Sequence, residues 1–180
     1  MTEVVVRHCA PTLAGIKAGG MINCDRCAAE SWMVAAEPAL QRAGMAQALL
    51  WQRSERVLLF IYRPKQLSDD WVREGIEPFM SALGYDIADV EKCIARLQAR
   101  FAEGCEFPHE VGLFLGYPLA DVLGFMKCGG KDYKHNGYWK VYGDEANARR
   151  AFEKFSACTR NLLRRYQCGI GFEQLIAAGR

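Results

Sequence analysis

Three stretches of the chain carry side chains that could do chemistry, and the first contains a cysteine. Cys9 lies in the segment His8–Lys17, shortly before Pro11, a residue type that is favoured at the start of a helix. A thiol at a helix N-terminus is acidified by unpaired N–H groups and by the helix dipole, as in many catalytic cysteines. Cys9 is therefore the candidate nucleophile, although a buried structural cysteine is the commoner role for such a residue.

The second stretch, Phe107–Met126, places a histidine beside a carboxylate. His109 and Glu110 stand at a predicted helix start, so His109 is the candidate base for Cys9 and Glu110 the group that orients the imidazole. His8, Cys9 and His109 are also candidate metal ligands. Helix capping is a commoner role for such a pair. No motif in the chain identifies a metal or a cofactor, so the identity of either stays open.

The same stretch has the spacing of a helix-turn-helix. Two short helices are predicted to begin near Pro108 and Pro118, with Gly116 in the turn. The second helix offers mainly apolar side chains over 119–123, whereas a helix that reads DNA presents polar and basic groups to the base edges. We therefore expect a packed helical hairpin, and nucleic acid is not its expected ligand.

The third stretch, Gly129–Asp144, is basic and aromatic. If residues 138–142 form a strand, alternate side chains share one face, which then combines tyrosine rings with a lysine. Such a strip could hold a small anionic or aromatic ligand by charge and stacking, although half-exposed tyrosines are also routine on antiparallel strands. The candidate ligand-binding residues are Lys17, Lys131, Tyr138, Lys140 and Tyr142.

The eight cysteines are the unusual feature of the composition. Cys24 and Cys27 have CxxC spacing, but no strand is predicted before them and no second pair exists, so their role stays open. The first ten residues lack the apolar core of a signal peptide, and no apolar run reaches the roughly 20 residues that span a bilayer. We therefore expect reduced thiols in a cytoplasmic protein without a membrane segment.

The formal net charge of +2 conceals two opposed segments. Leu67–Glu110 contains ten acidic and four basic residues, whereas Lys127–Cys168 contains ten basic and four acidic ones. We expect solvated helix faces that attract each other within one domain. The alternative is an adaptor that uses its basic C-terminal helix to bind nucleic acid or an acidic protein.

Local signals predict several elements. A short helix should begin at Pro11 and end at Gly19-Gly20. The apolar run Arg56–Arg63 predicts a buried strand, with Ala48–Gln52 as its candidate partner. Further helices are expected after the caps Ser68, Asp86 and Asp144, the second of them ending at Gly104. The expected fold is a single α+β domain over residues 1–180, with a small mostly antiparallel sheet flanked by four or more helices.

Three segments, His8–Lys17, Phe107–Pro118 and Gly137–Asp144, resemble the motifs of an uncharacterised bacterial protein family, the domain of unknown function 3793. The resemblance covers nearly the whole chain and implies a stand-alone cytoplasmic bacterial protein, but it brings no activity with it. The residues favour a small-molecule enzyme or ligand-binding protein with a Cys/His-containing site. A metal-binding or redox accessory protein is the first alternative, and whether the chain is an enzyme stays open.

Overall fold

The computed structural model describes residues 1–104 and 107–177, so Cys105 and Glu106 lie outside the described residues. The chain has an α+β fold, as predicted. The helices of the described ranges are α1 Thr2–Leu13, α2 Arg26–Arg42, α3 Pro64–Trp71, α4 Ile76–Ala82, α5 Val90–Glu103, α6 Val111–Phe114, α7 Leu119–Cys128, α8 Glu145–Gln167 and α9 Phe172–Ala177. The strands are β1 Gly19–Asp25, β2 Ala46–Arg53, β3 Arg56–Tyr62, β4 His135–Asn136 and β5 Lys140–Val141.

An antiparallel sheet with the order β1-β3-β2 forms the centre of the fold. The predicted strand at Arg56–Arg63 and its pairing with Ala48–Gln52 are confirmed, since β3 pairs with β2. β3 reads as a continuous apolar run because both of its faces are buried. β1 was not predicted: Gly19 and Gly20 begin this strand rather than end a helix.

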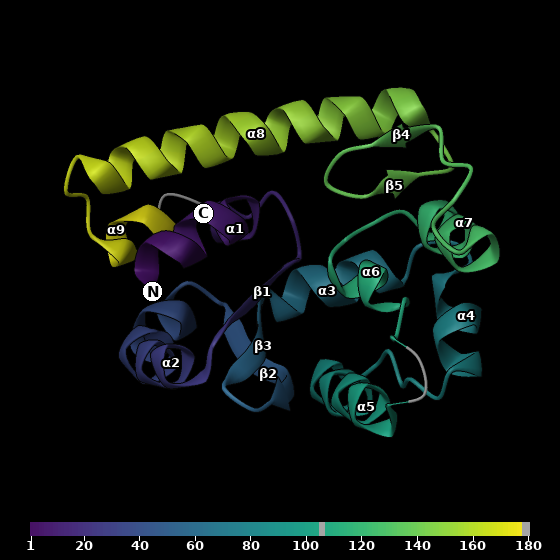
Figure 1. Ribbon diagram of the computed structural model, residues 1–180, viewed down its shortest axis with the longest axis horizontal. Coiled ribbons are helices and arrows are strands. Elements are labelled where there is room, and N and C mark those ends of the chain that lie inside the picture. Colours follow the sequence, from purple (N-terminus) through teal and green to yellow (C-terminus); the bar gives the residue numbers. More distant parts are fainter. Residues whose placement is uncertain (105–106, 178–180) are drawn as a thin grey trace.

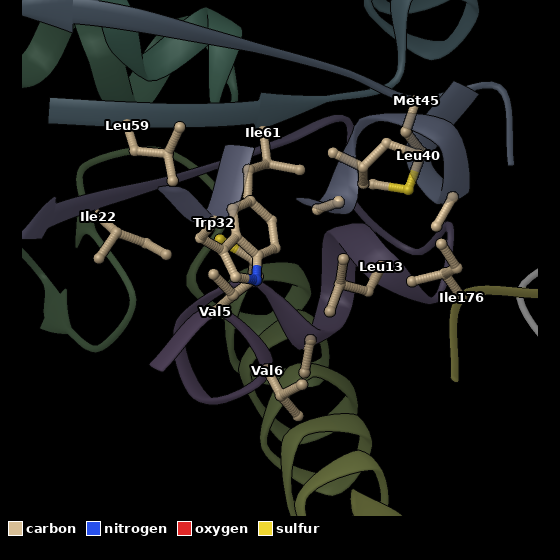
Figure 2. Close-up of a cluster of buried hydrophobic side chains, with 14 of the residues drawn as sticks. Val5, Val6, Leu13, Ile22, Trp32, Leu40, Met45, Leu59, Ile61 and Ile176 are labelled. Atoms are coloured by element: carbon tan, nitrogen blue, oxygen red, sulfur yellow. The ribbon is translucent and has the colours of Figure 1, made fainter. Parts of the chain in front are cut away.

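Helices cover both faces of this sheet (Figure 1). On one face, Leu59 and Ile61 of β3 meet apolar side chains from α1, α2 and α9, as Figure 2 shows. On the other face, Phe60 packs against Phe114 of α6, which in turn contacts Trp71 of α3. The two clusters lie on opposite sides of one sheet, so every residue of β3 except the first is buried.

The first helix begins much earlier than its sequence predicts. α1 starts at Thr2 and continues through Pro11, so the expected helix from Pro11 to Lys17 is wrong. The apolar residues Val5, Cys9 and Leu13 recur at helical spacing and are all buried against the core. This burial stabilises the helix enough to tolerate the hydrogen bond that a proline removes.

Of the remaining helix signals, two are confirmed and two are wrong. Asp144 caps α8 by accepting a hydrogen bond from the backbone N–H of Asn147, and Gly104 ends α5 with a φ of 68°. Asp89, rather than Asp86, caps α5. Ser68 is not a cap, because α3 begins at Pro64 and contains Ser68.

A short hairpin, β4–β5, replaces the longer strand expected over 138–142. The hairpin lies beside α7 and under the N-terminal half of α8, whose C-terminal half crosses α1 (Figure 1). In the described ranges, no helix is long and apolar enough to cross a membrane.

Candidate ligand-binding pocket

A cavity of about 300 Å³ opens between the α6–α7 hairpin and the β4–β5 hairpin. Both hairpins come from the stretches whose sequence predicted a site. Ligand sites in proteins are mostly apolar clefts with a few convergent polar groups, and this volume lies at the small end of their range. Residues from both hairpins and from the segment before α6 form its walls, among them Phe107, His109, Tyr117, Phe125, Tyr138 and Trp139.

The Asp121 carboxylate fastens the two hairpins together. Asp121 is only 3% exposed, and its Oδ2 accepts a hydrogen bond from the indole Nε1–H of Trp139 at 2.7 Å. Its Oδ1 accepts from the backbone N–H groups of Tyr142 and Gly143, also at 2.7 Å. Hydrogen bonds to a carboxylate are stronger than neutral ones. The buried charge is therefore compensated by three N–H donors, which hold the β4–β5 hairpin on α7.

Aromatic contacts make one wall of the pocket rigid. The Trp139 ring stacks on Tyr117 with centroids 4.7 Å apart, and it meets the Phe152 ring of α8 edge-on at 4.5 Å. The Lys17 ammonium covers Tyr117, 5.3 Å from its ring centroid. Burial raises the pKa of Tyr117 to about 12, so its hydroxyl stays protonated and can donate to the backbone oxygen of Tyr138.

Three polar side chains also line the cavity: His109, Asn136 and Lys140. The His109 ring lies 4.8 Å from that of Phe125, and its nitrogens have no hydrogen-bond partner among the described residues. Lys140 Nζ donates to the backbone oxygen of Gly130 at 2.7 Å, which uses one of its three N–H groups. The pocket thus combines a fixed aromatic wall with unused hydrogen-bonding capacity on an imidazole and an ammonium.

A family model matches residues 5–176, a range that contains every residue lining the pocket. The chain belongs to the family described as protein of unknown function (DUF3793). The resemblance predicted from the three motifs is therefore confirmed. No curated protein and no solved structure matches the chain, so the DUF3793 family supplies no activity or ligand to transfer.

In this DUF3793 chain, Cys9 lies away from the pocket. It is fully buried in the second half of α1, where Gly20 of β1 brings its backbone against the thiol, while Met21 faces the pocket from the opposite side of β1. Cys9 is thus not at a helix N-terminus, and the expected acidification has no source. Burial instead raises the pKa of Cys9 to about 12, an effect that the nearby Lys17 ammonium only partly offsets.

Glu110 points to a different neighbourhood from its sequence neighbour His109. Its Oε1 is buried and accepts hydrogen bonds from Arg100 Nε at 2.9 Å and from the Tyr85 hydroxyl at 3.0 Å. Burial raises the pKa of Tyr85, and the neighbouring Glu110 carboxylate raises it further. Glu110 therefore ties the segment before α6 to α5, and no hydrogen bond within the described residues joins it to His109.

The structure brings part of the predicted set together. His109, Tyr138 and Lys140 line one cavity, whereas Lys131 is exposed beyond it and Tyr142 packs on Gly124 of α7 with a buried hydroxyl. Residues of the predicted set that do not line the cavity are Cys9, Lys17, Glu110, Lys131 and Tyr142.

The predicted metal ligands do not assemble either. His8 is exposed on α1 while Cys9 is buried, and no group of three or more His, Cys, Asp or Glu residues in the described ranges could hold a metal ion. Cys24 is the second-last residue of the unpredicted strand β1 and is buried, whereas Cys27 is exposed in the first turn of α2. The eight cysteines are a modest number for this length, and those described are free thiols.

Sequence reasoning missed Asp121, although a signal for it exists. Asp121 is the one acidic residue of α7, a segment that is otherwise mostly apolar. A carboxylate in such a helix must either face solvent or find donors, and here the donors come from a hairpin about 20 residues later in the chain.

Proposed function

We propose that this protein binds a small planar anion in the pocket between the α6–α7 and β4–β5 hairpins. The observation that carries the proposal is that one cavity holds the aromatic rings of Phe125 and Trp139 together with His109 and Lys140, whose side-chain nitrogens have hydrogen-bonding capacity that no described residue uses. Aromatic walls favour a flat ring, and an imidazole and an ammonium favour a negative group on that ring.

The cavity limits the size of the ligand. About 300 Å³ admits one or two fused rings with one carboxylate or phosphate group. Asp121 does not oppose an anion strongly, because its two oxygens already accept three N–H groups from the hairpin. His109 is the group that could exchange a proton with a bound ligand, which would be the starting point of any catalysis.

A matched pair of probes tests the proposal. 2-Naphthoate and 2-naphthalenemethanol share the same rings and differ in charge, so isothermal titration calorimetry with both separates stacking from anion binding. Wild-type protein should bind the carboxylate more tightly than the alcohol. Lys140→Met should weaken naphthoate binding at least tenfold, because a hydrogen bond to a charged group contributes about 1.5–3 kcal/mol, and should leave the alcohol unaffected.

Lys127→Met is the matched control, since Lys127 is an exposed lysine at the end of α7 outside the pocket lining. This variant should bind naphthoate as the wild type does. Naphthoate binding that is absent at millimolar concentration, or that both lysine variants weaken equally, would contradict the proposal.

A further inference from the structure

The outer face of α8 carries a row of exposed basic side chains. Arg150, Lys154, Arg160 and Arg164 are exposed, and none makes an ion pair or side-chain hydrogen bond with any part of the chain that the structure describes. On α5, in contrast, each of the basic residues Lys92, Arg96 and Arg100 is paired with a carboxylate. The positive charge of these four residues is therefore directed to solvent, and Glu153 is the one acidic residue on the same face of α8.

The acidic segment of the chain does not neutralise this face. Mutual attraction between Leu67–Glu110 and Lys127–Cys168 was expected, but no ion pair of the described residues joins them. α8 packs on α1, α9 and the β4–β5 hairpin, whereas α5 lies on the opposite side of the molecule (Figure 1). The two segments meet in the pocket, where Phe107 and His109 of the first lie opposite the β4–β5 hairpin of the second, but no carboxylate of the first segment pairs with a lysine or arginine of the second among the described residues.

We propose that the outer face of α8 binds the phosphate backbone of duplex DNA without sequence preference. Arg150 to Arg164 span about 21 Å at 1.5 Å per residue, a length over which duplex DNA presents about twelve phosphates. The four side chains fan over an arc of about 120° at 3.6 residues per turn, and a helix fits the major groove of B-form DNA. Guanidinium groups bind phosphate through paired N–H donors.

The composition of the face favours DNA over other acidic partners. None of the large exposed apolar side chains lies on α8, whose apolar residues Phe152, Phe155 and Leu162 are buried. A protein interface needs apolar or aromatic anchors, and a helix that lies in a membrane surface needs an apolar face. Phosphate contacts need only charge. The major groove of duplex RNA is too narrow to admit a helix, which favours DNA.

Fluorescence anisotropy with a labelled 20-base-pair duplex of arbitrary sequence tests this proposal. Four phosphate contacts predict a slope of log K against log salt of about −3.6, hence about a 150-fold loss of affinity from 50 to 200 mM salt. The triple variant Arg150→Gln/Arg160→Gln/Arg164→Gln should bind at least tenfold more weakly at 50 mM salt, with a slope of about −0.9. Circular dichroism should show unchanged helix content.

The control is a second triple variant that changes the net charge by the same amount at residues outside α8. Arg53→Gln/Lys65→Gln/Arg73→Gln alters exposed residues of β2 and the α3 region and should leave DNA affinity within twofold of the wild type. The proposal is overturned by absent binding at 50 mM salt, by equal losses in both triple variants, or by strong dependence on DNA sequence. Tighter binding to duplex RNA, to phosphatidylserine vesicles or to polyglutamate would overturn it as well.

Discussion

Asp121→Asn should release the hairpin that carries half of the pocket. All three groups bonded to the Asp121 carboxylate are N–H donors, from Trp139, Tyr142 and Gly143. An asparagine has one oxygen and one NH₂ group where the aspartate has two oxygens. In either orientation of the amide, the NH₂ group therefore faces at least one of these N–H donors. The loss of one hydrogen bond to a charged group, together with an unpaired buried donor, should lower the free energy of unfolding by about 3 kcal/mol.

A double-mutant cycle isolates the bond to the indole. Trp139→Phe removes the N–H that conflicts with the new NH₂ and should itself cost about 2 kcal/mol in lost hydrogen bonding and contacts. The double variant Asp121→Asn/Trp139→Phe should then be about 2 kcal/mol more stable than the sum of the single changes predicts. Urea unfolding followed by circular dichroism gives all four free energies.

Additive effects in that cycle would refute the reasoning, because residues in direct contact should couple by more than about 0.5 kcal/mol. Asp132→Asn supplies the control: Asp132 is an exposed aspartate between α7 and β4 with a φ of 56°, a conformation that asparagine also tolerates. Its unfolding free energy should stay within about 0.5 kcal/mol of the wild type.

Three further perturbations follow from contacts around the sheet and the pocket. Arg63→Met should cost about 3 kcal/mol in urea unfolding, because the guanidinium donates to the last carbonyl groups of α1 and to the residue after α2; a cost below about 1 kcal/mol would contradict that role. Burial lowers the pKa of Lys17 from 10.5 to about 8, so the unfolded chain binds more protons above pH 8 and stability should rise from pH 8 to 9. Lys17→Met should abolish that rise in thermal unfolding scans, and an unchanged rise would assign it to another group. Gly124→Ala places a methyl group 2.4 Å from the Tyr142 ring and should cost about 1–3 kcal/mol and weaken naphthoate binding, whereas Gly171→Ala, which meets no atom within 4 Å, should be neutral in both assays.

Local signals were sufficient for elements whose ends are set by nearby residues. Asp144 and Gly104 could be recognised because a cap and a left-handed terminus depend on three or four neighbouring residues. The β3 strand was recognisable because both of its faces are apolar. The true extent of α1 was not recognisable, because its length depends on burial against α8. There the Cys158 thiol approaches the carbonyl oxygen of Ala10, which lies 148 positions earlier in the sequence.

Part of the lining of the candidate site could also be predicted from the sequence. His109, Tyr138 and Lys140 were identified from residue type and spacing, and they line one cavity. The prediction of Cys9 as a nucleophile depends on a helix that begins just after it, but α1 begins at Thr2 and places Cys9 in its second half. The lone carboxylate in the apolar helix α7 indicates that Asp121 needs donors, but these donors belong to a hairpin whose position only the folded chain defines.

The most direct test of the central claim, that the cavity beside Trp139 is a ligand site, is a ¹H–¹⁵N NMR titration with 2-naphthoate. The chain has four tryptophans, and their indole N–H signals report on separate regions. The signal of Trp139 and the amides of His109 and Lys140 should shift with saturation, while Trp32 and Trp71 stay unchanged. Shifts that centre on Trp32, or a Trp139 signal that does not move, would contradict the account.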